Sequence, residues 1–228
     1  MKGAGDPGGG GEELAALLER IVRLPRRGRR CLVAIAGPPA SGKSTLAAAL
    51  TARLAETGAE AANVPMDGFH LDNRILDARG LRARKGAPET FDAAGFLSLV
   101  RRLREEEAEV YYPIFDRAQD QAIAGAGVVG GNGPWVVVEG NYLLFAAPPW
   151  NALADLWDLS VWLETPEEVV RARCIQRWLD HGHAPEEARE RAEHNDLRNA
   201  RRIREARLPA DLTLRGGRLQ EDGPGDFF

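Results

Sequence analysis

The chain has 228 residues, 44% of them hydrophobic, and a net charge of −4. This apolar content is sufficient for the core of one domain, and the small negative charge indicates neither a nucleic acid nor an anionic membrane as a partner. Two cysteines, Cys31 and Cys174, cannot form a disulfide framework and suit a reducing compartment. No stretch is long and apolar enough to span a bilayer. The Gly-rich residues 1–11 lack the apolar segment of a signal peptide, so we expect a cytoplasmic protein with a disordered tail at 1–11.

Helical periodicity and short apolar runs alternate along the chain. The elements predicted from them are, in chain order, helix 12–24, strand 31–36, helix 44–56, strand 61–66, helix 92–106, strand 110–115, strand 135–138, short helix 149–157, strand 159–163, helix 165–179, helix 186–207 and strand 211–214. Residues 125–134 are Gly-rich and predict a hairpin or an excursion. Strands that alternate with helices predict a parallel sheet covered on both faces. We expect one domain at 12–215 and a C-terminal tail at 216–228.

Residues 67–90 carry many charges and glycines without a clean period. An irregular segment of this length inside a compact domain is usually functional or disordered. Asp92 follows it and is a candidate N-cap for the next helix.

The run Gly37-Pro-Pro-Ala-Ser-Gly-Lys-Ser44 matches the phosphate-loop pattern G-x-x-x-x-G-K-[ST] at every fixed position. It lies between a buried strand and a helix, the setting that this motif requires. Glycines let the backbone N–H groups face phosphates, Lys43 would bridge the terminal phosphates, and the Ser44 hydroxyl would bind Mg²⁺. The alternative is an ordinary Gly-rich turn. The residues expected to hold the nucleotide are Gly37, Ala40, Ser41, Gly42, Lys43, Ser44 and Thr45.

Lysine is scarce in this chain. Of the 30 basic residues only three are lysines, namely Lys2, Lys43 and Lys85. Because an ammonium and a guanidinium are not interchangeable, a lysine in this background is a candidate for a role that arginine cannot fill, with chance as the alternative.

Acidic residues follow two of the predicted strands. Asp67 ends the second strand, and the carboxyl ends of parallel strands are where ligands bind in open α/β sheets; its alternative role is to cap a turn, since Asp-Gly is a common turn pair. Glu139 directly follows the apolar strand at 135–138 and is a candidate support for Mg²⁺. The alternative for Glu139 is a surface acid.

Arginines gather on the helix at 165–179, just before His181-Gly-His183. Arg173 and Arg177 are four residues apart and share a face, and Arg171 lies close by. Mobile arginines can neutralise charge on a triphosphate, so we expect a lid at about 171–193; the alternative is a solvated basic face. Two histidines alone make a weak metal site, and we assign both to a turn of the lid.

These residues together resemble a known group, the bacterial pantothenate kinase, uridine kinase and phosphoribulokinase superfamily of P-loop kinases. The resemblance extends from about Cys31 to Leu214. Its most specific part is Met66-Asp-Gly-Phe-His-Leu-Asp-Asn73, Arg79-Gly-Leu81 and Lys85-Gly-Ala-Pro-Glu-Thr-Phe-Asp92, together with the turn Glu139-Gly-Asn141. Bacterial proteins labelled fructose transport system kinase or nucleoside/nucleotide kinase are similar to the chain almost throughout.

The resemblance implies a three-layer α/β P-loop fold with a mostly parallel sheet of about five strands and a helical lid. It implies catalytic roles for Asp67, Lys43 and Arg173, with Arg177 on the nucleotide and Mg²⁺ near Ser44 and Glu139. The substrate residues that it implies are Asp67, His70, Lys85, Asn141 and Asn199.

One position departs from the pantothenate kinases, which carry a Ser-His pair after a Pro-Val-Tyr strand. This chain has Pro113-Ile-Phe-Asp116-Arg117 there, closer to the Tyr-Asp of some uridine kinases. We therefore expect Asp116 and Arg117 to line the acceptor pocket and to suit a sugar, a nucleoside or a phosphorylated acid better than pantothenate.

The sequence thus predicts a kinase that uses ATP and Mg²⁺ to phosphorylate a hydroxyl of a small metabolite, with no nucleic-acid or membrane partner. One alternative is a P-loop NTPase that hydrolyses nucleotide to drive a conformational or delivery step. Another is a nucleotide-binding regulator without turnover. The oligomeric state stays open, with a homodimer among the alternatives.

Overall fold

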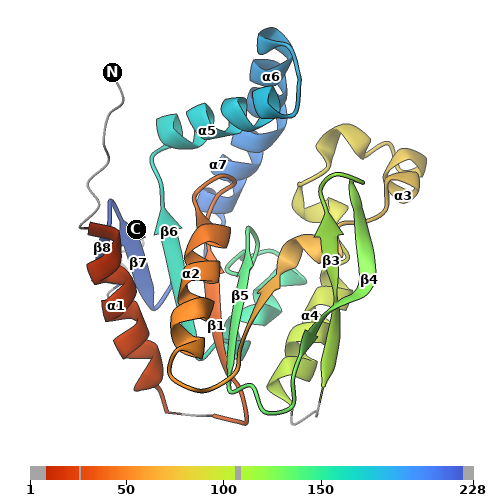
Figure 1. The fold of residues 1–228 in the computed structure, drawn as a ribbon. Helices are drawn as coiled ribbons and strands as arrows, with labels where there is room; N and C mark the ends of the chain where they lie inside the picture. The colour runs from red at the N-terminus through yellow and green to blue at the C-terminus, as the bar shows by residue number, and fades with distance from the viewer. Residues whose placement is uncertain (1–8, 26, 106–108, 223–228) are drawn as a thin grey trace.

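A six-stranded sheet forms the centre of the protein in the computed structural model, which describes residues 9–25, 27–105 and 109–222 (Figure 1). Neighbouring strands are parallel except for the last pair, which is antiparallel. In spatial order the strands are β2 (Ala61–Pro65), β5 (Trp135–Gly140), β1 (Cys31–Ala36), β6 (Leu159–Glu164), β7 (Leu212–Arg215) and β8 (Arg218–Glu221).

Alternating side chains of the central strand define the two faces of this sheet. All six residues of β1 are buried. Cys31, Val33 and Ile35 pack in one cluster with α1 (Gly9–Val22) and α2 (Lys43–Ala55), while the residues between them pack in another with α4 (Ala93–Arg104). A strand buried on both faces is what a continuous apolar run predicts. The result is the expected three-layer α/β architecture.

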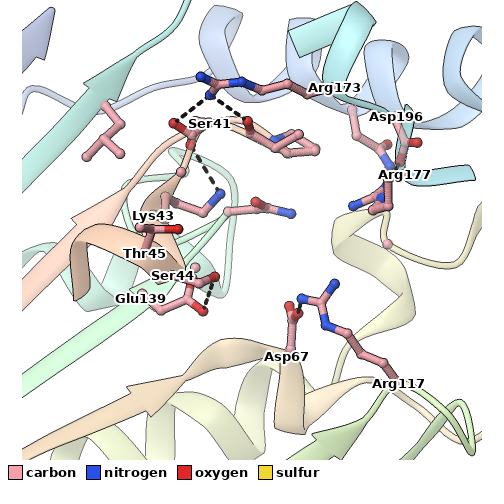
Figure 2. A pocket seen from close by; sticks show the side chains of 18 of the residues that line it. Ser41, Lys43, Ser44, Thr45, Asp67, Arg117, Glu139, Arg173, Arg177 and Asp196 are labelled. Carbon is pink, nitrogen blue, oxygen red and sulfur yellow. Dashed lines mark hydrogen bonds and ion pairs between the residues drawn. The ribbon is translucent and has the colours of Figure 1, made fainter. Parts of the chain in front are cut away.

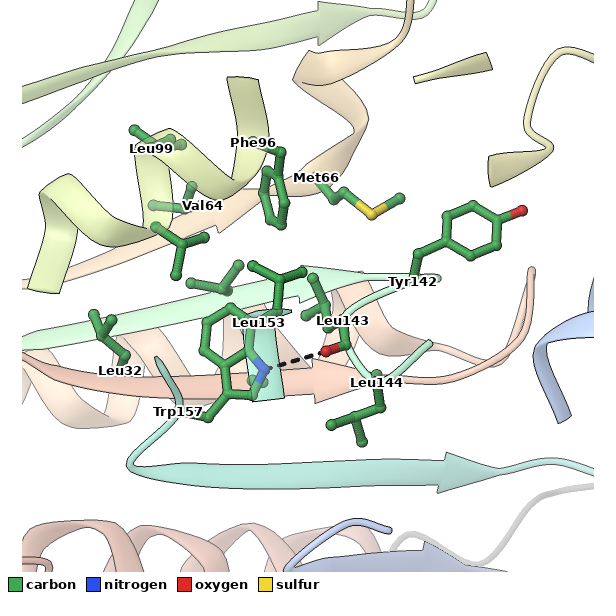
Figure 3. Close-up of a cluster of buried hydrophobic side chains, with 14 of the residues drawn as sticks. Leu32, Val64, Met66, Phe96, Leu99, Tyr142, Leu143, Leu144, Leu153 and Trp157 are labelled. Carbon is green, nitrogen blue, oxygen red and sulfur yellow. Dashed lines mark hydrogen bonds between the residues drawn. The ribbon is translucent and has the colours of Figure 1, made fainter. Parts of the chain in front are cut away.

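The cluster on the α4 face contains much of the aromatic core (Figure 3). Trp157 is buried there, and its indole Nε1 donates to the Leu143 carbonyl at 3.2 Å. Tyr142 lies in the same cluster, but its hydroxyl donates to the Gly86 carbonyl at 2.6 Å. Buried polar groups of aromatic side chains usually find such partners. The hydrogen bond from Tyr142 connects the irregular segment 67–90 to the turn that follows β5.

That segment contains short helices: the 3₁₀ helix η1 (Met66–Phe69), α3 (Asn73–Ala78), η2 (Arg82–Arg84) and η3 (Pro88–Thr90). It folds back because the Leu71 N–H donates to the Thr90 carbonyl at 3.0 Å and the Asp92 N–H donates to the Phe69 carbonyl at 2.8 Å. As predicted, Asp92 caps α4, accepting from the Gly95 N–H at 2.8 Å. The predicted end of that helix at residue 106 lies outside the described residues.

Other boundaries differ from the sequence-based expectation. The Gly-rich stretch contributes to strand β4 (Gln121–Val129), which pairs antiparallel with β3 (Val110–Asp116) in a separate two-stranded sheet. Helix 186–207 is divided into α6 (Pro185–Arg191), a π-helical stretch (Ala192–Leu197) and α7 (Arg198–Glu205), and it follows α5 (Glu167–Asp180). The segment 149–157 forms the 3₁₀ helix η4 (Trp150–Leu156).

The two expected tails also contain regular structure. Residues 9–11 belong to α1, and residues 218–221 form β8, which extends the sheet to a sixth strand. Its Leu219 packs with the α1 and α2 cluster, which explains why these residues are ordered against the sheet. Residues 1–8 and 223–228 lie outside the described residues. Within the described part of the chain, every helix is too short or too polar to cross a membrane.

Candidate active site

A cavity of about 1710 Å³ opens at the carboxyl ends of the parallel strands. Its walls are the phosphate loop, the turn after β2, the end of β5, the tip of the β3–β4 hairpin and the α5–α6 region. In Figure 1 the helices α5 and α6 lie above the α2 N-terminus, and the α3 segment lies to its right. This is the edge at which ligands of open α/β sheets bind.

The phosphate loop owes its shape to two backbone conformations. Gly42 immediately precedes α2 and has φ of +99°, a left-handed conformation that glycine adopts at little cost. Ala40 also has a positive φ, of 56°. A non-glycine residue held in this way occurs mostly where the surroundings dictate it, often at functional sites. The loop thus turns directly into the N-terminus of α2, where free N–H groups and the helix dipole favour anions.

Lys43 is buried within this loop. Its Nζ donates to the Pro38 carbonyl at 2.8 Å and lies 3.5 Å from the Ser41 hydroxyl oxygen. Burial lowers the pKa of Lys43, and the carboxylates of Glu139 and Asp67 act in the opposite direction. The ammonium is therefore held by loop oxygens and by negative charge on two sides, in a place where a phosphate oxygen could replace the carbonyl as its partner.

Ser44 and Glu139 come together from two elements. The Ser44 hydroxyl, in the first turn of α2, donates to Glu139 Oε1 at 2.9 Å. Glu139 belongs to β5 and pairs in register with Ile35 of β1 and Pro65 of β2, which places it at the same edge as the loop. Burial raises the pKa of Glu139, and Lys43 opposes that shift. The alternative of a surface acid is wrong, since Glu139 is only 7% exposed.

Asp67 faces the phosphate loop across the cavity (Figure 2). It lies in the 3₁₀ turn directly after β2, and its Oδ2 accepts from the Arg117 guanidinium at 3.1 Å. Among the described residues no backbone N–H donates to this carboxylate, so the structure gives no support to a turn-capping role. The following Gly68 is needed for contact instead: a Cβ there would lie 2.0 Å from the Pro113 carbonyl oxygen. This close approach to β3 brings Arg117 within reach of Asp67.

The three arginines of α5 divide between two roles. Arg173 donates to the carbonyls of Ala40 and Ser41 at 3.2 and 3.4 Å, so it lies over the phosphate loop. Arg177 lines the cavity and pairs with Asp196 at 2.9 Å. Arg171 lies outside the cavity lining, in ion pairs with Glu193 and Glu167. Arg173 and Arg177 therefore face the site as expected, and the solvated-face alternative fits Arg171.

The end of the cavity near Asp67 is built from aromatic rings and a partly exposed ion pair. His70 stacks on Phe91 with ring centroids 4.0 Å apart, and Phe115 lies at 4.9 Å. Burial lowers the pKa of His70 to about 4, so the ring is neutral near pH 7. Lys85 Nζ binds Asp120 Oδ1 at 2.7 Å. Neither side chain therefore presents an uncompensated charge to the cavity.

Sequence reasoning missed Arg84 and Asn195, which help to connect this end of the cavity to the π-helical stretch and α7. Arg84 donates to the side-chain oxygens of Asn195 and Asn199, both at 2.9 Å. Asn195 in turn donates to the Lys85 carbonyl at 2.7 Å. Asn199, a predicted substrate residue, lines the cavity but is held by Arg84. The π-helical stretch that presents Asn195 is a signal in itself, because π-helical insertions occur frequently at functional sites, but it is not visible in the sequence.

The structure corrects the expectation for Asp116. Its carboxylate lies outside the cavity lining and accepts from the backbone N–H groups of Ala118 and Gln119, at 2.8 and 3.0 Å, at the tip of the β3–β4 hairpin. The N–H groups of a turn have no partner in the β-sheet, and an aspartate at this position commonly accepts hydrogen bonds from them. Asp120, four residues later, supplies the cavity carboxylate instead. Of the other predicted residues, Gly37 begins the loop outside the cavity lining, and the rest line the cavity: Ala40, Ser41, Gly42, Lys43, Ser44, Thr45, Asp67, His70, Lys85, Arg117, Glu139, Asn141, Arg173, Arg177 and Asn199.

Comparison with known proteins agrees with this geometry. The model of the phosphoribulokinase / uridine kinase family matches residues 32–194. The chain is 37% identical over 213 residues to the "Putative uridine kinase C227.14" of Schizosaccharomyces pombe, covering 90% of this chain and 91% of that protein. It is 33% identical over 151 residues to a pantothenate kinase of Leifsonia xyli, covering 64% of this chain but only 45% of that protein. A solved structure described as a "putative fructose transport system kinase", from Silicibacter sp. TM1040, superimposes with a TM-score of 0.84 at 55% identity, covering 88% of this chain and 98% of that one.

The strand–loop–helix phosphate site on a mostly parallel sheet defines a nucleotide-binding protein of the P-loop class. The match over residues 32–194, together with relatives of this identity and coverage, shows the particular group. The chain belongs to the phosphoribulokinase / uridine kinase family.

Proposed function

We propose that this protein is an ATP-dependent kinase that transfers the γ-phosphoryl group to a hydroxyl of a small metabolite. The observation that carries the proposal is that one cavity joins the phosphate loop to Asp67 and continues into a walled space beside His70, Phe91 and Phe115. A cavity with this shape has room for two ligands, a triphosphate at the loop and an acceptor beyond it. Family membership supports the kinase class, while the acceptor and its hydroxyl are part of the proposal.

The residues near the loop fit a magnesium ion. Ser44 and Glu139 offer oxygen ligands, the kind that Mg²⁺ prefers, and they already lie 2.9 Å apart in a hydrogen bond. Within the described part of the chain the buried Glu139 carboxylate accepts a hydrogen bond from Ser44 and lies near the charges of Lys43, Asp67 and Arg117. When bound to a nucleotide at this site, Mg²⁺ would neutralise charge on the phosphate oxygens.

The chain's own residues would act as follows. Lys43 and the loop N–H groups hold the phosphates in line with the acceptor, and Arg173 covers them and excludes water. The bond from the γ-phosphorus to the β-phosphate oxygen breaks while a bond to the acceptor oxygen forms. Asp67 orients the acceptor hydroxyl and takes up its proton. In this arrangement Arg117 is released from Asp67 or shared with the acceptor.

The acceptor class stays broad: a sugar, a nucleoside or a pantothenate-like molecule. The sequence argument against pantothenate rested on the missing Ser-His pair and on Asp116 and Arg117 as pocket residues, and of these two only Arg117 lines the cavity. Pantothenate therefore remains among the acceptors to be tested. The rival function, nucleotide hydrolysis that drives a conformational or delivery step, needs no acceptor space.

An acceptor screen tests the proposal. ADP formation is measured with ATP and Mg²⁺ alone and after addition of sugars, sugar acids, nucleosides or pantothenate. We expect turnover to be low without an acceptor and to rise when one compound of this set is added, with a phosphorylated product detected by mass spectrometry. Turnover that is fast and equal with and without every compound would favour the hydrolase instead.

Glu139 provides a prediction about the metal. The Glu139→Gln variant is expected to need about 10- to 100-fold more Mg²⁺ for half-maximal turnover, because groups that hold a bound metal typically contribute this much to its affinity. Calorimetry of nucleotide binding with and without Mg²⁺ gives a second reading: affinity for the metal-free nucleotide should change little.

The matched control is Glu56→Gln, an exposed acid just beyond the other end of α2 that pairs with Arg53 and lies outside the cavity. It should leave the Mg²⁺ requirement unchanged. If the Mg²⁺ requirement changed equally in both variants, or changed in neither, Glu139 would not support the metal.

A further inference from the structure

The cavity continues past the phosphate loop on the side away from Asp67. This end lies between α1, the first turns of α2 and the β7–β8 turn, and its walls are mainly the leucines Leu14, Leu163, Leu214 and Leu219. A smaller hollow of about 250 Å³ opens from the same wall and shares Leu163, Leu214 and Gly217 with the large cavity. Apolar walls next to a phosphate site suit the base of a nucleotide.

One acidic side chain stands among these leucines. Glu13 of α1 lines the cavity, and its Oε2 is cut off from solvent with no hydrogen-bond partner. No ion pair within the described part of the chain involves it. Its helix neighbours behave differently, because Glu12 is exposed and Glu19 is exposed and pairs with Arg23. A buried oxygen without a donor is costly in a folded protein, so a ligand donor at this position would relieve that cost.

The β7–β8 turn leaves space for the Glu13 side chain. Gly217 has φ of +77°, and a Cβ built on it would lie 3.6 Å from Glu13 Oε1. The left-handed backbone conformation at position 217 favours glycine. The Glu13 carboxylate lies next to this residue, at van der Waals distance from where a Cβ would be. Glu13 therefore lies where α1 meets the β7–β8 turn, next to Gly217, which lines both cavities.

We infer that Glu13 reads the base of the nucleoside triphosphate by accepting a hydrogen bond from a ring amino group, such as N6 of adenine. An ionised carboxylate offers only acceptors, so it selects bases that present a donor at that edge. The leucines contact the faces of the ring. The inference rests on the proposed function, because it needs the phosphate loop to hold a nucleoside triphosphate.

The test compares two triphosphates that differ only in the amino group. ATP and purine riboside triphosphate, which lacks the N6 amine, are titrated calorimetrically against the wild type and the Glu13→Ala variant in the presence of Mg²⁺. Hydrogen bonds to charged groups are worth about tenfold or more in affinity. We expect the wild type to bind ATP about tenfold more tightly than the analogue, and the variant to bind the two equally.

Glu12→Ala, on the exposed side of the same helix, should keep the wild-type preference. The ratio of the two affinities is measured within each variant, so a loss of stability that affects both ligands cancels. Equal binding of both nucleotides by the wild type, or the same preference in Glu13→Ala, would overturn the inference. Binding is measured without an acceptor; hence an enzyme that binds ATP selectively but fails the acceptor screen would disprove the kinase proposal and leave the role of Glu13 standing.

Discussion

Replacing Lys43 with methionine is expected to lower turnover by roughly 10²–10³-fold or more, because the ammonium is a preorganised charge next to the phosphates. Methionine keeps much of the apolar stem of lysine and lacks the donor. The hydrogen bonds from Nζ to Pro38 and Ser41 join parts of one loop and hold no distant elements together. The variant should therefore fold, which circular dichroism and thermal unfolding would check beside the rate measurement.

A second substitution, Lys43→Arg, tests whether any cation suffices. The space around the buried Nζ is enclosed by loop oxygens, and a planar guanidinium needs a different arrangement of acceptors. We expect Lys43→Arg to lose most activity as well, which would explain a lysine here in a chain that otherwise uses arginine. Wild-type turnover in a folded Lys43→Met variant would disprove the phosphate role of this residue.

The phosphate site could be predicted because its signal is local. A buried strand, a glycine pattern and a helix start occupy consecutive residues, and each has a physical cause that acts within a few positions. The same holds for Glu139, which lies at the carboxyl end of the apolar strand β5. Parallel strands then bring their carboxyl ends together, so the pairing of Ser44 with Glu139 follows from two short-range predictions and one rule of topology.

The parts that sequence reasoning missed depend on distant contacts. Arg84 donates hydrogen bonds to Asn195 and Asn199, which lie more than one hundred residues away in the sequence. Sequence periodicity does not predict such long-range contacts. Asp116 and Asp120 are both acids at a hairpin tip; which of them faces the cavity depends on which one the turn N–H groups bind. Strand β8 was missed because a short polar run gains its order from pairing with β7 and from the packing of Leu219.

Asp67 distinguishes a kinase from a protein that merely binds nucleotide. The Asp67→Asn variant keeps the shape of the side chain and removes its charge. We expect acceptor-dependent turnover to fall by roughly 10²–10⁴-fold, the usual contribution of a positioned general base, although in a loose phosphoryl-transfer transition state part of this loss comes from orientation. Affinity for ATP should change little, because Asp67 faces the loop from across the cavity instead of belonging to it.

Stability should also change little in Asp67→Asn. The charge that is lost pairs with Arg117, whose side chain is 59% exposed, and exposed pairs contribute about 0–1 kcal/mol. Asp72→Asn is the matched control, because Asp72 lies in the same segment outside the cavity and caps α3 through the Arg74 N–H at 2.8 Å. Asparagine caps helices about as well as aspartate, so the control should retain wild-type turnover. If Asp67→Asn were as active as Asp72→Asn, with the acceptor at saturation and ATP affinity unchanged, Asp67 would have no part in the transfer, and acceptor activation would have to come from another cavity group.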